Sequence, residues 1–172
     1  MNILACDLAT TLGWAFGNLG GAPIWGHHRN GGRAGASVGA KLDDYANWLE
    51  RQIATLKPDS IWLETPFVGR DVNASTVLLL YGLAAFTARE AWRRDITLHR
   101  VTTHEVTKFF LGSAGRRRVD KKAATIARCL ELGWRVESDD EADALALFCL
   151  AEARLAPRSA RVGLPLLSQH RP

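Results

Sequence analysis

Four acidic side chains stand at positions where burial would make an isolated negative charge costly. Asp7 lies inside an apolar run near the start of the chain, and Glu64 closes the run "IWLE". Asp140 and Asp143 begin a long apolar segment, "DDEADALALFCL". A carboxylate removed from water needs a partner cation or a bound metal ion, and ligand sets made only of oxygen favour Mg²⁺ or Mn²⁺ over zinc. Two such ions side by side are the usual means of in-line displacement at a phosphodiester, so these residues indicate metal-dependent phosphodiester chemistry.

Part of the acidic cluster follows from helix formation alone. Ser138 and Glu141 have the spacing of a capping box, and Asp139 lies in the first turn, where a carboxylate interacts favourably with the helix dipole. The residues that follow are apolar all around, which is typical of a helix enclosed by protein. Asp143 lies on this helix one turn after Asp140. These two are the acids that the helix start does not explain.

The elements that would position the acids can be predicted from apolar periodicity. A short apolar run indicates a buried strand, and an apolar residue at every third or fourth position indicates a helix. The expected strands are residues 3–8, 13–17, 23–28, 60–63 and 96–101. The expected helices are residues 41–56, 74–92, a short helix opened by a capping box at 102–105, residues 120–132 and a last helix from 138. Three strands in a meander, followed by alternating helices and strands, fit a three-layer α/β domain with a mixed sheet.

Two of the expected helices carry further predictions. The helix over residues 74–92 is apolar on nearly every side, more than one core-facing stripe requires. Its spare face predicts packing against a second subunit, so we expect a homodimer. In the helix over residues 120–132, Asp120 is the predicted N-cap. The predicted inward face of that helix consists of Ala123, Ile126, Ala127 and Leu130.

The mixed sheet would bring the acids together. If the strands that carry Asp7 and Glu64 are parallel neighbours, about 4.8 Å apart, their carboxylates lie side by side at one edge of the sheet. Ligand sites in open α/β sheets gather at the carboxyl ends of the strands. A last helix packed across that edge would deliver Asp140 and Asp143 to the same place. Four like charges cannot share one place without cations, so this arrangement predicts bound divalent metal.

Length and composition favour one intracellular domain. The chain has 172 residues, of which 47% are hydrophobic, enough for one globular domain with a full core. We expect this domain over residues 1–156 and a flexible tail over residues 157–172. Cys6, Cys129 and Cys149 are widely spaced in apolar contexts, which predicts buried reduced thiols. No stretch is long enough to span a bilayer and no signal peptide is recognisable, so the expected location is cytoplasmic, with no membrane partner.

The basic residues are unevenly distributed. The net charge is +4, from 22 Lys and Arg against 18 Asp and Glu. Five basic side chains fall within the seven positions 116–122, "RRRVDKK". A modest basic excess permits a polyanionic partner without requiring one. The alternative for this segment is a solvated charged loop.

Several motifs, taken together, resemble one known family. The segments "ILACDLATTLGWA", "IWLETPF", "EVTKFFLGSAG" and "DDEADALAL" are similar in order and spacing to the RuvC-type Holliday junction resolvases, which have the ribonuclease H-like fold. The resemblance covers about residues 3–151 and implies a mixed five-stranded sheet flanked by helices. It also implies a dimeric, Mg²⁺-dependent DNA endonuclease that nicks symmetric strands of a four-way junction. Actin-like ATPase domains open with a similar first motif, but they need a duplicated second domain, for which 172 residues leave no room.

The resemblance assigns roles to single residues. The metal-binding catalytic acids of the family correspond to Asp7, Glu64, Asp140 and Asp143, which would hold two Mg²⁺ ions, with Mn²⁺ as a substitute. Lys121 corresponds to the family's lysine near the scissile phosphate, where it would offset developing charge. The adjacent Lys122 is not excluded from that role.

The same resemblance indicates a DNA-binding set. Phe67 matches the family's aromatic residue that stacks on unpaired bases near the crossover, and the alternative is a loop aromatic that folds back on the core. The run Arg116–Arg118 departs from the family pattern and would strengthen general phosphate binding. The DNA-binding candidates are Phe67, Arg70, Lys108, Arg116, Arg117, Arg118 and Lys122.

Two other functions stay open on the sequence. One is a related nuclease that cuts other branched DNA or an RNA–DNA hybrid. The other is a non-catalytic dimer that binds branched DNA, which is disfavoured because unused buried acids would cost stability. The five histidines have no ligand-like spacing with the acids, so we expect them to be structural or surface residues.

Overall fold

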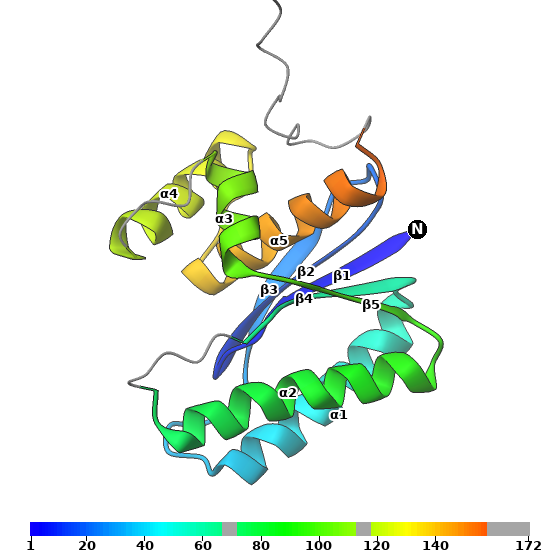
Figure 1. Cartoon of the computed structure of the whole chain (residues 1–172), viewed down its shortest axis with the longest axis vertical. Coiled ribbons are helices and arrows are strands. Elements are labelled where there is room, and N and C mark those ends of the chain that lie inside the picture. The colour runs from blue at the N-terminus through cyan, green and yellow to red at the C-terminus, as the bar shows by residue number, and fades with distance from the viewer. Residues whose placement is uncertain (67–71, 113–117, 158–172) are drawn as a thin grey trace, which may run out of the picture.

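A five-stranded sheet lies at the centre of the molecule (Figure 1). The computed structural model describes residues 1–66, 72–112 and 118–157, without the side chains of Arg118 and Val119. The strands are β1 (Asn2–Asp7), β2 (Thr11–Asn18), β3 (Ile24–Arg29), β4 (Ser60–Glu64) and β5 (Thr97–Val101), in the order β3-β2-β1-β4-β5. The first three strands are antiparallel neighbours, whereas β4 runs parallel to both β1 and β5. The predicted mixed sheet is confirmed.

Helices cover both faces of this sheet. The first layer holds α1 (Val38–Leu56) and α2 (Ala74–Arg93), and the second holds α3 (Thr103–Leu111), α4 (Arg118–Glu131) and α5 (Asp139–Leu155) (Figure 1). Each layer has its own apolar core. Side chains alternate between the two cores along β1, with Ile3 and Ala5 facing the α5 layer and Leu4 and Cys6 facing the α1–α2 layer. Because both faces are covered, β1 and β4 are apolar at almost every position.

The last helix lies directly on the middle of the sheet because β2 offers it small residues. Gly13, Ala15 and Gly17 alternate along β2 and face α5. A Cβ atom at Gly17 would lie 2.9 Å from a ring carbon of Phe148, a residue of α5. This close approach buries α5 on almost every side, which accounts for its apolar sequence.

Two helices begin earlier than the sequence predicts. α1 begins at Val38 because the Ser37 hydroxyl accepts a hydrogen bond from the backbone N–H of Ala40, at 3.2 Å. α4 begins at Arg118, so Asp120 lies in its first turn and the prediction of Asp120 as N-cap is wrong. The capping box of Thr102 and Glu105, by contrast, is confirmed at the start of α3.

The predicted inward face of α4 is also largely wrong. Thr125 and Cys129 are the buried residues of this helix, and Ile126 is partly buried. The other three predicted residues, Ala123, Ala127 and Leu130, are exposed. The Thr125 hydroxyl donates to the carbonyl oxygen of Lys121 at 2.9 Å, so this polar side chain can be buried without an unpaired donor.

Other predictions have mixed outcomes. The three cysteines are free and buried, as expected. Among the described helices, none combines the length and the apolarity that crossing a membrane requires. Residues 158–172 lie outside the described part of the chain, so the flexible tail and the domain boundary stay predictions.

Candidate active site

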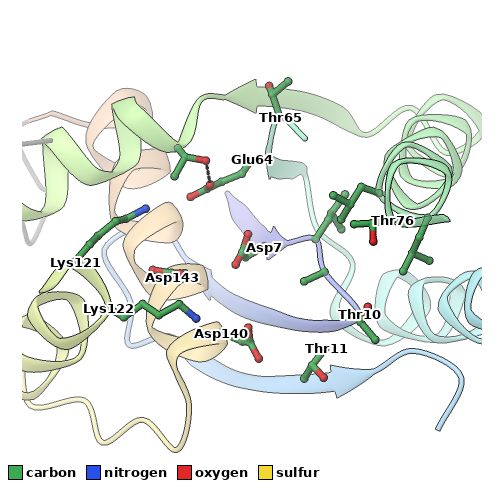
Figure 2. A pocket seen from close by; sticks show the side chains of 15 residues that line it. Asp7, Thr10, Thr11, Glu64, Thr65, Thr76, Lys121, Lys122, Asp140 and Asp143 are labelled. Carbon is green, nitrogen blue, oxygen red and sulfur yellow. Dashed lines mark hydrogen bonds between the residues drawn. The ribbon is translucent and has the colours of Figure 1, made fainter. Parts of the chain in front are cut away.

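The first two acids lie side by side at the carboxyl ends of two parallel strands. β1 ends at Asp7, and β4 ends at Glu64. Cys6 pairs with Leu63 in the parallel ladder, so the two acids follow at adjacent positions and point to the α5 face (Figure 2). The strand geometry that the sequence predicted for this pair is therefore confirmed.

The start of α5 brings the other two acids to the same edge. A Cβ atom at Gly13 would lie 1.8 Å from the carbonyl oxygen of Asp140, so the first turn of α5 rests on the backbone of β2. Gly13 pairs with Asp7 in the antiparallel ladder. Asp140 and Asp143 consequently line the pocket that Asp7 and Glu64 also line, whose volume is about 750 Å³ (Figure 2).

Burial raises the pKa of all four acids in this pocket, and neighbouring carboxylates raise the pKa of Asp7 and Asp143 further. Burial raises the pKa of Asp7 well above its ordinary value, and the neighbouring carboxylates raise it further, Glu64 most strongly. Burial, with help from Glu64 and against the charge of Lys121, raises the pKa of Asp143 to about 6. The pKa of Asp140 is raised by burial too, although Lys122 and His27 act in the opposite direction. A group of carboxylates with this pattern favours a bound cation.

Two lysines of α4 face the acids from one side of the pocket (Figure 2). The charge of Lys121 lowers the pKa of three of the acids, Asp7, Glu64 and Asp143. Lys122 forms an ion pair with Asp139, and its charge lowers the pKa of Asp140 and Asp143. Lys121 therefore interacts with acids from β1, β4 and α5, whereas Lys122 interacts with α5 alone.

Sequence reasoning did not assign the threonines of this site. The Thr103 hydroxyl donates a hydrogen bond to Glu64, which opposes the rise that burial causes in the pKa of this carboxyl. Glu64 pairs with Val101 on β5, and Thr103 lies two residues after Val101 in the sequence. That register is a signal that could have identified Thr103. Thr10, Thr11 and Thr76 also line the pocket.

The DNA-binding candidates are only partly placed. Lys122 lines the pocket, whereas Lys108 is exposed on α3 and is not among the residues that line it. Arg118 begins α4, but its side chain is outside the described part of the chain. Outside it altogether are Phe67, Arg70, Arg116 and Arg117.

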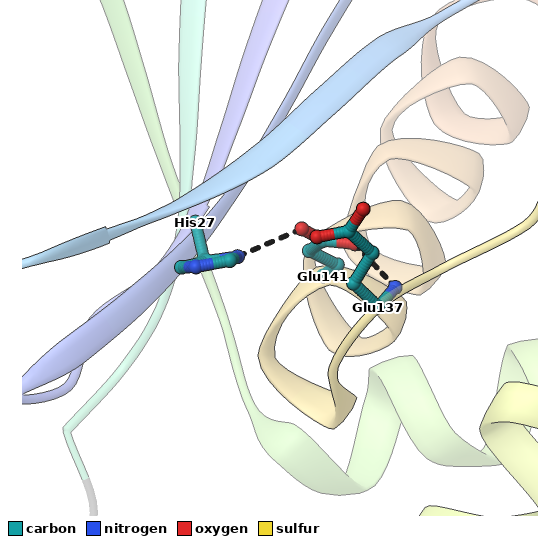
Figure 3. Close-up of side chains that lie close together, drawn as sticks. All are labelled: His27, Glu137 and Glu141. Atoms are coloured by element: carbon teal, nitrogen blue, oxygen red, sulfur yellow. Dashed lines mark hydrogen bonds and ion pairs between the residues drawn. The ribbon is translucent and has the colours of Figure 1, made fainter.

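A second polar group lies beside the start of α5 (Figure 3). His27, Glu137 and Glu141 each offer a ligand atom, and these atoms lie within 4.8 Å of one another. The Ser138 hydroxyl accepts from the N–H of Glu141, as the capping box predicts. The Glu141 carboxylate, however, accepts from the N–H of Glu137, one residue earlier than predicted, at 2.8 Å.

Comparison with known proteins gives a fold. No protein-family model matches the sequence, and neither does any curated protein. RuvC of Thermus thermophilus in complex with a Holliday junction substrate superposes with a TM-score of 0.66 at 14% identity, over 86% of this chain and 90% of that chain. A second structure of Thermus thermophilus RuvC gives a TM-score of 0.60 at 13% identity, over 96% and 100% of the two chains. This chain has the RuvC fold.

A yeast structure superposes on this chain as well. The yeast mitochondrial Holliday junction resolvase Ydc2 superposes with a TM-score of 0.56 at 13% identity, over 84% of this chain and 75% of that chain. The ribonuclease H-like class predicted from the sequence is therefore confirmed.

The side chains of the pocket fit divalent cations. The donors are carboxylate oxygens from β1, β4 and α5, and hard cations such as Mg²⁺ and Mn²⁺ prefer such ligands. Positive charge placed among the acids would oppose the rise in pKa that burial and neighbouring carboxylates cause at Asp7 and Asp143. The residues that could hold metal in this pocket are Asp7, Glu64, Asp140 and Asp143.

Proposed function

We propose that this chain is a Mg²⁺-dependent DNA endonuclease that resolves four-way junctions by paired, symmetric nicks. The observation that carries the proposal is the convergence of four carboxylates from β1, β4 and α5 in one pocket, beside Lys121. The RuvC fold supports it, because one structure with this fold is a complex with a Holliday junction substrate. The reaction is phosphodiester hydrolysis, with two metal ions held by the four acids.

The acids and the lysine have separate tasks in this reaction. Bound Mg²⁺ would activate the attacking water and stabilise the departing 3′ oxygen, and Mn²⁺ would serve in its place. Thr103 orients the Glu64 carboxylate through its hydrogen bond. Lys121 faces the same acids and offsets the negative charge that develops on the phosphate. Lys122 is held by Asp139, so we assign it to binding of the DNA backbone.

The metal assignment is tested by substituting an acid with its neutral isostere. We expect Asp7→Asn and Asp143→Asn each to reduce Mg²⁺-dependent nicking of a labelled four-way junction by about 10³-fold or more, because the carboxylate that holds the cation is lost. Binding to the junction is expected to survive, since neither residue is basic. The matched control is Asp43→Asn, an exposed acid of α1 on the opposite layer. Full nicking by both site variants would contradict the proposal.

The substrate is tested with the wild-type protein. Labelled four-way junction, plain duplex, replication fork and RNA–DNA hybrid are incubated with Mg²⁺, Mn²⁺ or Ca²⁺. We expect paired nicks in the junction with Mg²⁺ and Mn²⁺ and binding without cutting in Ca²⁺. Preferential cutting of the hybrid would indicate the related nuclease instead, and binding without cutting in every metal would indicate a non-catalytic junction-binding protein.

Paired nicks require two active sites, and α2 supplies a surface for a homodimer. Leu78, Tyr81 and Trp92 are 60%, 52% and 84% exposed on this helix. Tyr81 follows Leu78 by three positions and Trp92 follows Tyr81 by eleven, which places all three on one side of the helix. Other apolar residues of α2, such as Leu79 and Leu83, pack in the core. Large apolar side chains grouped on one exposed face are typical of an interface between subunits.

The dimer is tested by charge on that face. We expect Leu78→Asp to convert a dimer to a monomer in sedimentation at micromolar concentration and to change paired nicks into single ones. Leu130→Asp on α4 is the matched control, because Leu130 is 54% exposed but lies in the other layer. A wild-type protein that sediments as a monomer would count against both the dimer and paired incision.

A further inference from the structure

His27 connects the sheet to the helix that carries two of the site acids. Its Nδ1 atom, on β3, donates a hydrogen bond to Oε1 of Glu141, on α5, at 2.8 Å (Figure 3). The Glu141 side chain is 5% exposed, whereas His27 is 44% exposed. Glu141 lies between Asp140 and Asp143 in the sequence, so a contact that holds Glu141 also holds the turn that carries both acids.

His27 stands in the same row of the sheet as the first site acid. Asp7 on β1 pairs with Gly13 on β2, and Gly13 pairs with His27 on β3. Residues that pair in this way point to the same face of the sheet. The row therefore runs under the start of α5, from the pocket at Asp7 to the hydrogen bond at His27.

Two contacts fix the first turn of α5 on this row. The first contact is at Gly13, where a Cβ atom would lie 1.8 Å from the carbonyl oxygen of Asp140. The helix backbone touches the sheet backbone there, which sets the distance between the first turn of α5 and the sheet. At His27, the hydrogen bond to Glu141 holds the turn against movement across the sheet. Metal sites are sensitive to such outer contacts, because small displacements of a ligand weaken the coordination.

We propose that His27 is a positioning residue that sets Asp140 and Asp143 against Asp7 by holding Glu141. The functional part of this inference rests on the proposed function, since it concerns the same metal ligands. His27 contacts neither substrate nor metal in this role.

A metal ion bound by His27, Glu137 and Glu141 is the competing explanation of the same cluster. Their ligand atoms are close enough for one. However, both oxygens of the Glu141 carboxylate already accept hydrogen bonds, one from His27 and one from the N–H of Glu137. These hydrogen bonds account for the positions of His27 and Glu141, so we assign the cluster to positioning and let the experiment decide.

The neighbouring residue offers a matched control on the other face. His28 donates from Nε2 to Oδ2 of Asp44, on α1, at 2.9 Å. Asp44 also accepts the backbone N–H of Gly31, as Glu141 accepts that of Glu137, although Asp44 is 37% exposed and Glu141 is buried. This histidine stacks on Trp48, and α1 carries none of the site acids. A Phe substitution at either position keeps a ring and removes the donor.

The experiment compares His27→Phe, His27→Asn and His28→Phe with the wild type. Mn²⁺ affinity is measured by calorimetry without DNA, and the Mg²⁺ concentration for half-maximal nicking is measured with the junction. We expect His27→Phe to weaken Mn²⁺ binding and to raise the Mg²⁺ requirement by about tenfold, with little change in the maximal rate. His27→Asn is expected to restore both values, because the Asn amide places a donor where Nδ1 stood. His28→Phe is expected to leave both unchanged.

A further readout does not depend on nuclease activity. In metal-free protein, we expect amide hydrogen exchange over residues 138–143 to accelerate in His27→Phe and to match the wild type in His27→Asn and His28→Phe. Equal behaviour of the two Phe variants would overturn the positioning role. So would the loss of one equivalent of Mn²⁺ with the affinity of the others unchanged, since it would reveal a metal at His27. If amide exchange responds as expected while the wild type binds no metal and cuts no DNA, the proposed function is wrong. In that case the inference that His27 positions the first turn of α5 is still supported.

Discussion

The two layers of the molecule bury acids in opposite ways. In the α1–α2 layer, Glu90 of α2 is 1% exposed and its carboxylate contacts the guanidinium groups of Arg89 and Arg94. In the α5 layer, Asp7 is surrounded by other acids, and its pKa is raised by burial and by those acids together. A buried charge with a partner holds its element in place, whereas buried like charges cost stability until cations arrive. The difference separates an acid that stabilises the fold from acids to which the proposed function assigns a reaction.

The origin of the partners differs as well. Glu90 and its arginines belong to α2 and the residue that follows it, so they meet as soon as that helix forms. The site acids come from two strands and a helix that are far apart in the sequence, so they meet only in the finished fold. In the α1–α2 layer, the negative charge of Glu90 is paired by residues near it in the sequence. In the pocket, the negative charges come together only through tertiary structure.

The sharpest test of this comparison is to neutralise one acid in each layer. In EDTA, we expect Glu90→Gln to lower the free energy of unfolding by about 2–3 kcal/mol, because two charged hydrogen bonds are weakened. Asp7→Asn is expected to leave it unchanged or to raise it, because repulsion among the acids falls. Urea unfolding measures both. Equal destabilisation by the two substitutions would remove the distinction between the layers.

A smaller effect should appear in the dependence of stability on pH. Asp143 has a folded pKa of about 6 against an ordinary value of 3.8, so the folded protein takes up a proton first as the pH falls. The metal-free protein therefore gains stability between pH 7 and pH 4.5, by about 2 kcal/mol from this group. The gain continues until the pH falls below the unfolded pKa.

Comparison with Asp143→Asn isolates the contribution of that carboxyl. The difference in unfolding free energy between wild type and variant, measured in urea with EDTA at the two pH values, is expected to move in favour of the wild type at pH 4.5. A difference that is the same at both pH values would mean that Asp143 is not destabilised by its surroundings. Saturating Mg²⁺ is expected to shift the whole effect to lower pH, because a bound cation favours the ionised carboxylate.

The smallest effects are expected when one hydroxyl group is removed from each layer. In the α1–α2 layer, the hydroxyl of Tyr45 is hydrogen-bonded to that of Thr87 at 2.6 Å. Tyr45→Phe is expected to cost about 1 kcal/mol of stability and to leave nicking unchanged. Thr103→Val is expected to change stability less and to raise the Mg²⁺ requirement by about tenfold or less, because Glu64 loses its orienting donor. Thermal unfolding and metal titration read out the two effects, and an exchange of the two phenotypes would contradict the assignment.

Much of the fold was predictable because its signals are local. The runs around Asp7 and Glu64 end in acids at the carboxyl ends of strands, and parallel pairing then places them together. The inward face of α4 was not predictable from apolarity, because Thr125 satisfies its own hydroxyl within the helix and is buried, while the alanines stay outside. The start of α1 depended on one serine hydroxyl in a Gly-rich segment, where periodicity carries no information.

Contacts between residues far apart in the sequence form the part of the site that could not be predicted. His27 and Glu141 are 114 positions apart, and no sequence pattern around either residue predicts their contact. Thr103 becomes a neighbour of Glu64 only through the β4–β5 register. The four acids could be found because burial makes them unusual. Their supporting residues are ordinary in type and become visible only through geometry.

The close contact between Gly13 of β2 and the start of α5 has a consequence for relatives of this chain. Because Gly13 lets the helix backbone touch the sheet, a single methyl group there would lift Asp140 away from Asp7 without altering any acid. A homologous chain with alanine or serine at this position would keep all four acids and still hold two of them away from the other two. Under the proposed function, inactive relatives are therefore recognisable at a position that takes no part in the chemistry.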